Sequence, residues 1–308
     1  MLRFKSEQKR HVIRGVHVGG QPGDLPCVLC GSIFYEGHTI VEDAERGVFD
    51  RQRAEHVINR QRVLSDETGI PCMVVVYART SMAMERYIAF VSEVDECPIV
   101  LDSTEASVRA HAATFVSEVG LADACVYNSI NIGITPEERE ALARSDVEAA
   151  IVLAFNPRNT SLDGRLAVLE HGDGLIDTGL LEMAAQCGIT KPLVDPSATA
   201  LGEHSGVVLG MTMVVKARYG LPCGSGIHNV VSSWGWLRER RKRHPEAYVA
   251  CDAATIALQI AACGDFVLYG PVEYAEYAFP CAAMCEVMMA ETSEHTRPIR
   301  GHPATRVV

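Results

Sequence analysis

Four polar side chains follow short apolar runs of the kind that form buried strands. They are two carboxylates and two carboxamides: Asp102, Asn128, Asp195 and Asn229. The strand ends around them hold almost no Lys or Arg, which disfavours a phosphate or carboxylate substrate that would need cationic partners. An Asp carboxylate can accept two N–H bonds side by side, and an Asn amide offers one donor group and one acceptor. This set is typical of a site for a neutral heterocycle with an amidine-like edge, such as a pterin or guanine.

Two serines belong to the same segments. Ser197 lies two residues after Asp195, and Ser225 lies four residues before Asn229. We include both hydroxyls among the candidate substrate contacts. A single Asp at a strand end is as often the cap of the next helix, but several polar strand ends together favour a shared site over a series of separate caps.

Other chemistries fit these residues less well. Asp102 and Asp195 could form a glycosidase pair, but the chain has only two Trp to serve as sugar platforms. A Schiff-base enzyme needs a Lys near a strand end, and Lys191 lies at the start of its run. A metal hydrolase needs His pairs, whereas His204 and His228 stand alone. We expect His228, beside glycine-rich sequence, to be a hydrogen-bonded structural residue.

The eleven cysteines are expected to be packed and reduced. Cys27 and Cys30 form the only CxxC motif, but residues i and i+3 of a strand point to opposite faces and cannot readily share a metal. Cys281 and Cys285 lie four apart on a predicted helix, so they could be ligands; free buried Cys is the commoner role. We therefore expect no bound metal.

Eight apolar runs alternate with helical stretches, and these elements must position the polar groups. The runs are Val28–Tyr35, Cys72–Ala78, Pro98–Asp102, Ala124–Asn128, Ala149–Asn156, Pro192–Asp195, Pro222–Ile227 and Phe266–Gly270. The expected helices cover Asp50–Thr68, Ser81–Glu93, Ala106–Glu118, Pro136–Ala143, Asp177–Cys187, Gly206–Tyr219, Asp252–Ala262 and Val272–Glu291. Continuous apolar strands between helices indicate a parallel sheet covered on both faces. Eight of them predict an α/β fold, the (β/α)8 TIM barrel, whose active site lies at the carboxyl ends of the strands.

We expect residues 1–308 to form a single domain, because no linker or change of composition interrupts the pattern. No GxGxxG motif follows an early strand, which argues against a dinucleotide-binding fold. The segment before Val28 contains Gly19-Gly20 and Pro22-Gly23 and is expected to form a short hairpin or lid over the barrel.

The net charge of −11 argues against a nucleic-acid or anionic-membrane partner. The apolar run Val207–Val215 holds nine residues, well below the ~20 of a membrane span. No apolar stretch follows the basic start of the chain, so we expect a cytoplasmic protein without direct membrane insertion. The basic run Arg238–Arg243 is either a solvated helix face or a docking patch for an acidic protein.

Eight strings along the chain resemble one known family. They are Gly19-Gly-Gln-Pro-Gly23, Gly31-Ser-Ile-Phe-Tyr35, Leu101-Asp-Ser-Thr104, Gly120-Leu-Ala-Asp123, Tyr127-Asn-Ser-Ile-Asn131, Ala154-Phe-Asn-Pro157, Gly224-Ser-Gly-Ile-His-Asn229 and Gly264-Asp-Phe-Val-Leu-Tyr-Gly-Pro271. They resemble the H subunit of tetrahydromethanopterin S-methyltransferase and its bacterial relatives, from residue 15 to beyond residue 270. More distantly, the pattern is similar to pterin-binding methyltransferases that serve corrinoid iron–sulfur proteins and to dihydropteroate synthase.

The resemblance implies transfer of a methyl group from a methylated corrinoid to N5 of a tetrahydropterin. We expect the bacterial branch, with tetrahydrofolate as the acceptor and methylcobalamin supplied by a corrinoid carrier protein. The chain lacks the Asp-x-His-x-x-Gly motif that would bind the corrinoid itself. By the family pattern, Asp102, Asn128 and Asp195 would hold the pterin ring and Asn229 would face N5. A homodimer is expected.

Two alternatives stay open at this point. The same chemistry could use tetrahydromethanopterin, with the chain as a subunit of a larger methyltransferase complex. The barrel could instead be a non-catalytic pterin-binding scaffold subunit. A C–N bond-forming enzyme like dihydropteroate synthase is disfavoured, because the loops after the seventh and eighth runs show no Lys or Arg for a diphosphate.

Overall fold

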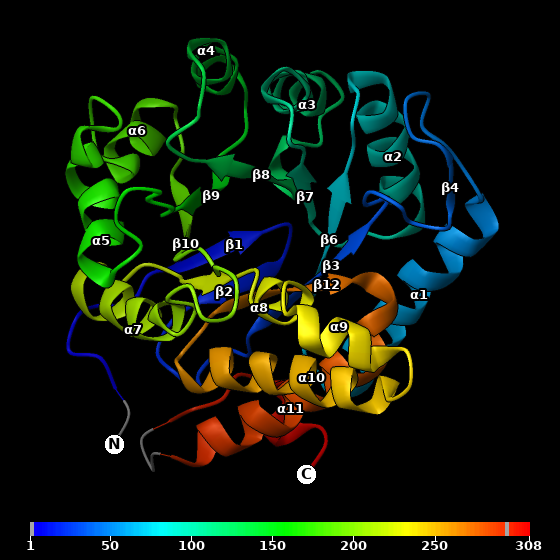
Figure 1. Cartoon of the computed structure of the whole chain (residues 1–308), viewed down its shortest axis with the longest axis vertical. Coiled ribbons are helices and arrows are strands. Elements are labelled where there is room, and N and C mark those ends of the chain that lie inside the picture. Colours follow the sequence, from blue (N-terminus) through cyan, green and yellow to red (C-terminus); the bar gives the residue numbers. More distant parts are fainter. Residues whose placement is uncertain (1–2, 293–295) are drawn as a thin grey trace.

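The computed structural model describes residues 3–292 and 296–308. In that part of the chain, eight parallel strands form a barrel: β3 (Val28–Ile33), β6 (Cys72–Tyr77), β7 (Ile99–Asp102), β8 (Cys125–Ile130), β9 (Ala149–Leu153), β10 (Lys191–Asp195), β11 (Gly224–Ser225) and β12 (Phe266–Pro271). Hydrogen bonds join them in the order β10-β9-β8-β7-β6-β3-β12-β11. A parallel bridge between Val194 and Cys223 closes the ring. The predicted (β/α)8 barrel is confirmed (Figure 1).

Helices surround the barrel (Figure 1). They are α1 (Arg51–Thr68), α2 (Ser81–Val94), α3 (Ala106–Glu118), α4 (Pro136–Arg144), α5 (Leu162–His171), α6 (Leu180–Gln186), α7 (Val207–Tyr219), α8 (His228–Ser232), α9 (Gly235–Arg241), α10 (Pro245–Ala261) and α11 (Ala275–Glu291). Short 3-10 turns cover Ala122–Ala124, Gly172–Gly174, Val272–Tyr274 and Pro303–Thr305. All the expected helices are present, within a few residues of their expected ends except at the start of α10. The sequence patterns did not predict α5, α8 or the small hairpin of β4 (Val41–Asp43) and β5 (Val48–Phe49).

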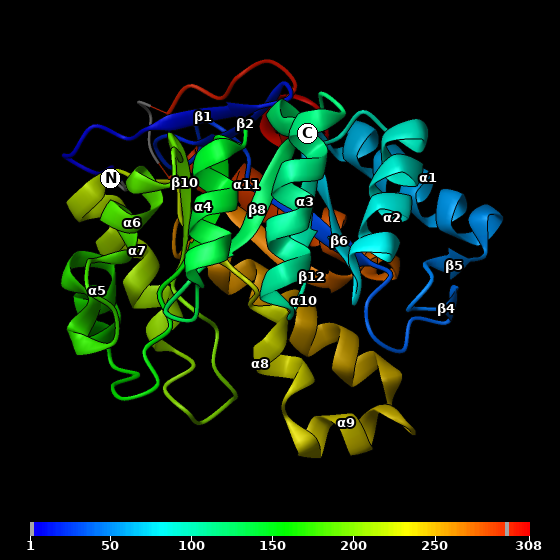
Figure 2. The ribbon, with the colours of Figure 1, turned by 90° about the horizontal axis from the view of Figure 1, so that it is seen from above.

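An antiparallel hairpin of β1 (Arg10–Ile13) and β2 (Val16–Gly19) closes the amino-terminal end of the barrel. Its side chains Ile13 and Val18 are buried in one apolar cluster with the barrel-interior residues Val28, Met73 and Phe266. Figure 2 shows the hairpin at one end of the molecule and α8 and α9 at the other. The predicted amino-terminal hairpin is therefore confirmed, and it forms a plug at the end of the barrel opposite the carboxyl ends of the strands.

Two apolar layers fill the fold, one inside the barrel and one between the strands and the helices. The CxxC motif spans both, since Cys30 belongs to the inner cluster and Cys27 to the outer one. This confirms that the two thiols point to opposite sides of the barrel wall. All eleven cysteines are free, and eight of them are buried. Among the residues described, no helix combines the length and the apolar character needed to cross a bilayer.

Candidate active site

A cavity of about 320 Å³ opens at the carboxyl ends of the strands. Asp102, Asn128, Asp195 and Asn229, which the sequence singled out, all line it. Ligand cavities commonly measure about 300–1,000 Å³, so this one suits a single bicyclic ring with any substrate tail lying outside. The structure thus brings together residues that are far apart in the chain.

Asp102 and Asn128 form a pair on neighbouring strands. They face each other in the register of β7 and β8, and the amide Nδ2 of Asn128 donates to Oδ1 of Asp102 at 3.1 Å. This bond orients the Asn128 amide. The pair therefore presents carboxylate acceptors beside an amide oxygen, as recognition of adjacent N–H groups requires.

Asp195 joins the ends of β10 and β11. Its Oδ1 accepts from the backbone N–H of Ser197 at 2.7 Å, and its Oδ2 accepts from the N–H of Gly226 at 3.4 Å. The loop after β10 is held by Arg165 of α5, which donates to the carbonyls of Pro196 at 2.7 Å and Ser197 at 2.8 Å. The helix that the sequence patterns missed thus fixes the backbone around a cavity carboxylate.

Burial raises the pKa of both carboxyls. The pKa of Asp102 rises to about 6, and so does that of Asp195, chiefly because each charge is removed from water. Nearby Arg109 and the bond from Asn128 partly offset the effect at Asp102. At neutral pH both groups are mostly ionised but poorly solvated, so N–H donors from a ligand would relieve an existing cost.

The two candidate serines do not line the cavity. The hydroxyl of Ser225 is fully buried and donates to Oε1 of Gln259 on α10 at 2.7 Å. Ser197 is buried, with a left-handed φ of 67°, and its backbone N–H bonds Asp195. These serines support the site from behind, so we do not retain them as substrate contacts.

One cation on the cavity wall was not anticipated. Arg109 of α3 lines the cavity, but its Nε bonds the fully buried Glu138 at 2.8 Å and its Nη1 bonds the carbonyl of Ser103 at 2.6 Å. The hydroxyl of Tyr127 also donates to Glu138, at 2.5 Å. Because Glu138 neutralises this guanidinium, the site remains suited to a ligand without a phosphate.

His228, the first residue of α8, also lines the cavity. Its Nδ1 lies 2.9 Å from Oδ1 of Asp252 on α10. The expected hydrogen bond is therefore confirmed. Its partner and its position beside Asn229 at the cavity were not predicted. Within the described ranges, no cluster of three or more His, Cys, Asp or Glu side chains could hold a metal ion.

The geometry places the polar groups on opposite sides of the barrel. In the closed order of eight strands, β7 and β11 are four positions apart, as are β8 and β12. Asp102 therefore lies across the opening from the segment after β11, which carries His228 and Asn229. A flat ring bound in the cavity would contact the carboxylate pair at one edge and this segment at the other.

Solved structures of pterin enzymes share this barrel. A Yersinia pestis dihydropteroate synthase in a sulfonamide drug complex aligns with a TM-score of 0.64 at 13% identity, over 92% of this chain and 100% of that one. The same enzyme with a pterine-sulfa conjugate aligns with a TM-score of 0.62 at 12% identity, with the same coverage. The fold of the protein is therefore a TIM barrel like that of these dihydropteroate synthases.

Sequence comparisons show the family. The profile of the tetrahydromethanopterin S-methyltransferase MtrH subunit matches residues 6–298. The H subunit of a putative Mtx methyltransferase from Methanosarcina acetivorans is 50% identical over the whole of both chains. The H subunit of the tetrahydromethanopterin S-methyltransferase from Methanothermobacter thermautotrophicus is 46% identical over 98% of each chain. The chain belongs to the MtrH family of methyltransferase subunits, and the resemblance found in its sequence is confirmed.

The raised pKa of Asp102 makes a prediction about stability. The pKa of Asp102 is about 6 in the folded protein, against an ordinary value of 3.8, so ionising Asp102 destabilises the fold increasingly between about pH 4 and pH 6 and fully above that. Asp102→Asn removes that charge and keeps the side-chain shape. We expect the variant to exceed the wild type in free energy of unfolding by about 1–3 kcal/mol at about pH 8, with the difference vanishing by about pH 4.

Denaturant unfolding at both pH values measures this effect. Asp123→Asn, at an exposed position, is the matched control and should change little at either pH. Equal stability of Asp102→Asn and the wild type at the higher pH would contradict the assigned cost of burial.

Proposed function

We propose that this protein transfers a methyl group between a corrinoid and N5 of tetrahydromethanopterin, as one component of a larger methyltransferase assembly. The single observation that supports it most is the carboxylate–carboxamide pair of Asp102 and Asn128 at the barrel opening of an MtrH-family chain. The sequence favoured tetrahydrofolate. The names of relatives at 44–46% identity favour tetrahydromethanopterin, the alternative, and we adopt it.

The proposed binding mode uses the width of the barrel opening. The amidine-like edge of the pterin donates N–H groups to Asp102 and bonds Asn128, while Asp195 receives further donors where β10 and β11 meet. The N5 side then lies across the opening beside Asn229. This arrangement is supported by the positions of β7 and β11 on opposite sides of the ring.

The proposed chemistry is an in-line displacement. When the methyl group passes to N5, the Co–C bond breaks and both of its electrons stay on cobalt. The leaving group is then Co(I), which is a good one. The main task of this chain is to position the two reactants, which can contribute on the order of 7–11 kcal/mol. The Asn229 amide can rotate to offer its oxygen to an N–H or its NH₂ group to a lone pair.

The test is an anaerobic assay of the purified protein with methylcobalamin and either tetrahydromethanopterin or tetrahydrofolate, followed by the absorbance of Co(I). We expect faster turnover with tetrahydromethanopterin. Turnover with tetrahydrofolate alone would overturn the choice of pterin and restore the bacterial branch. If neither pterin reacts, even when a methylated corrinoid carrier protein is added, the protein is a non-catalytic scaffold.

Two alanine variants separate the proposed roles. Asn229→Ala should lower kcat by more than it raises the dissociation constant of the pterin, because its contact strengthens as N5 changes charge. Asp102→Ala should mainly weaken pterin binding, since it removes the acceptor for the far edge of the ring. Steady-state kinetics with pterin-binding calorimetry measures both, and equal losses of rate and affinity in the two variants would contradict these roles.

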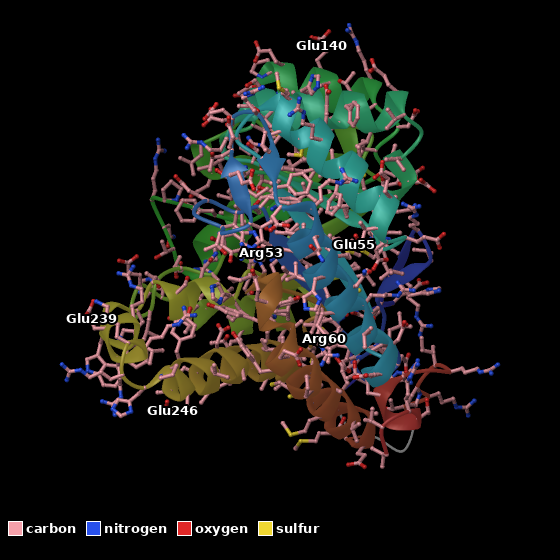
Figure 3. All side chains as sticks on the ribbon, turned by 90° about the vertical axis from the view of Figure 1, so that its right-hand side faces the viewer. Arg53, Glu55, Arg60, Glu140, Glu239 and Glu246 are labelled. Carbon is pink, nitrogen blue, oxygen red and sulfur yellow. The ribbon has the colours of Figure 1, made fainter. Side chains whose placement is uncertain are left out.

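We also propose α9 as the docking surface for the corrinoid carrier. It begins three residues after α8 ends, and it projects beyond the barrel on the side opposite the amino-terminal hairpin (Figure 2). Arg238–Arg243 holds five cations against one carboxylate, in a chain of net charge −11. Figure 3 shows Glu239 of this segment at the outer edge of the molecule. An acidic carrier protein fits this charge.

The surface combines these cations with an aromatic anchor. The rings of Trp234 and Trp236 stack with centroids 5.1 Å apart, and Trp236 is 58% exposed. Arg241 instead lies over the ring of Tyr248, 4.3 Å from its centroid, and attaches α9 to α10. Exposed Trp and Arg are the residues that most often dominate protein interfaces. The homodimer expected from the sequence stays a prediction.

Charge reversal tests the docking surface. Arg238→Glu with Arg243→Glu should slow transfer from an acidic carrier-bound corrinoid by at least about tenfold and leave transfer from free methylcobalamin unchanged. Lys5→Glu with Lys9→Glu, two exposed cations near the amino-terminal hairpin, is the control. Equal rates from the carrier in all three proteins would rule out α9 as the docking surface.

A further inference from the structure

His228 has one ring nitrogen bound and the other directed to no protein partner. Its Nδ1 is bonded to Asp252, its side chain is 13% exposed, and no hydrogen bond to its Nε2 is found in the described part of the chain. The ring lies on the cavity wall against Gly270, where a Cβ would come within 2.6 Å of it. Gly270 also has a φ of +88°, which favours glycine. Both the contact with His228 and the backbone conformation therefore require glycine at this position.

Asp252 holds the imidazole in one orientation. It is 1% exposed, and its second oxygen accepts the hydroxyl of Tyr277 at 2.6 Å. Burial and Asp252 hold the pKa of the Tyr277 phenol far above its usual range, so this hydroxyl only donates. With both carboxylate oxygens occupied, Asp252 keeps the proton of a neutral imidazole on Nδ1. The cavity-side Nε2 is then a proton acceptor, and a donor when the ring is charged.

The other groups around His228 leave this nitrogen available. Tyr248 and Tyr274 pack on the ring, with centroids 6.5 and 5.7 Å away, and Arg241 lies behind them. On the cavity side the charged groups are Asp102, Asp195 and Arg109, the last already paired with Glu138. His228 directly precedes Asn229 in the chain. Its Nε2 therefore reaches the cavity wall with no protein partner among the described residues.

We propose that His228 is a catalytic residue that carries the proton of pterin N5, with Asp252 as its positioning residue. This inference rests on the proposed methyl transfer and extends it. An amide such as Asn229 can orient N5 but has no acidic proton to give. A histidine held by a carboxylate can both give and take one.

The proton balance differs with the direction of transfer. When the methyl group leaves N5, the His228 imidazolium protonates N5, Co(I) attacks the methyl carbon, and the N5–C electron pair stays on nitrogen as an N–H amine. In the opposite direction, N5 attacks the methyl carbon, the Co–C pair stays on cobalt as Co(I), and the N5 proton passes to neutral His228. Solvent then restores the starting state of the ring.

The experiment uses the N5-methyl pterin and Co(I) cobalamin, because the two kinds of titrating group then act on opposite limbs of the pH profile. Ionised Asp102 and Asp195, with pKa values of about 6, are needed for binding, so kcat/KM should fall on the acid side. Charged His228 is needed for transfer, so kcat/KM should fall on the alkaline side. His228→Gln should lower kcat by about 10² and abolish the alkaline limb only, with pterin affinity changed less than about threefold.

Three further variants make the test specific. Asp252→Asn should lower kcat more than pterin affinity, because the imidazole loses the carboxylate that orients it. His228→Ala should regain rate when imidazole is added, which an unfolded or merely distorted variant would not. His111→Gln is the control, since His111 forms the same kind of pair with Glu85, at 2.6 Å, on the outer helices. It should match the wild type.

The possible outcomes distinguish the role of His228 from the proposed methyl transfer on which it rests. A wild-type protein that transfers no methyl group overturns the proposed function, and the inference with it. A wild type that turns over, with His228→Gln keeping the alkaline limb or losing rate and pterin affinity equally, overturns the inference alone. Failure of imidazole to restore any rate to a folded, pterin-binding His228→Ala also overturns it.

Discussion

Parallel pairing around a closed ring is the constraint on which the rest of this structure depends. Because all eight barrel strands run in one direction, their polar carboxyl ends meet at a single rim, although they are spread over more than a hundred residues. The seam between β10 and β11 is the critical contact. There the N–H of Val194 donates to the carbonyl of Pro222 at 2.9 Å, and Asp195 bonds the N–H of Gly226. Opening this seam would separate Asp195 from the segment that carries Asn229.

The two ends of the barrel have different tasks. At the amino-terminal end, the β1–β2 hairpin completes the interior apolar cluster, and its base is fixed by Lys216, whose ammonium bonds both Asp265 and the carbonyl of Gly20. The cavity at the other end is lined mainly by polar groups, with Val75, Leu153 and Leu268 among them. Substitutions in the plug should therefore act through stability, whereas substitutions at the rim act through binding and chemistry.

The sequence predicted the barrel and the four cavity residues because both signals are local. A continuous apolar run marks a buried parallel strand, and the polar residue that ends it lies at the rim.

The direction of a side chain and its partners far away in the chain leave no local pattern in the sequence. Ser225 lies on a two-residue strand, too short for alternation to show that it faces α10. Asp252 follows His228 by 24 positions, and Glu138 follows Arg109 by 29, so only the packed helices bring these pairs together. The helix α5 was missed because Gly164 weakens its helical sequence pattern, although Ser161 caps its start.

Electrostatics links the stability of the site to its selectivity. Two poorly solvated carboxylates with raised pKa values destabilise the empty protein at neutral pH, and the guanidinium of Arg109 on the cavity wall is already bound to Glu138. The fold therefore keeps negative charge that a ligand with N–H donors can compensate. The exposed cations of α9 lie outside the cavity and would not neutralise it. A substrate that brought its own carboxylate or phosphate into the cavity would add repulsion to this cost. The ring of a tetrahydropterin would enter, and any anionic tail would remain in the solvent.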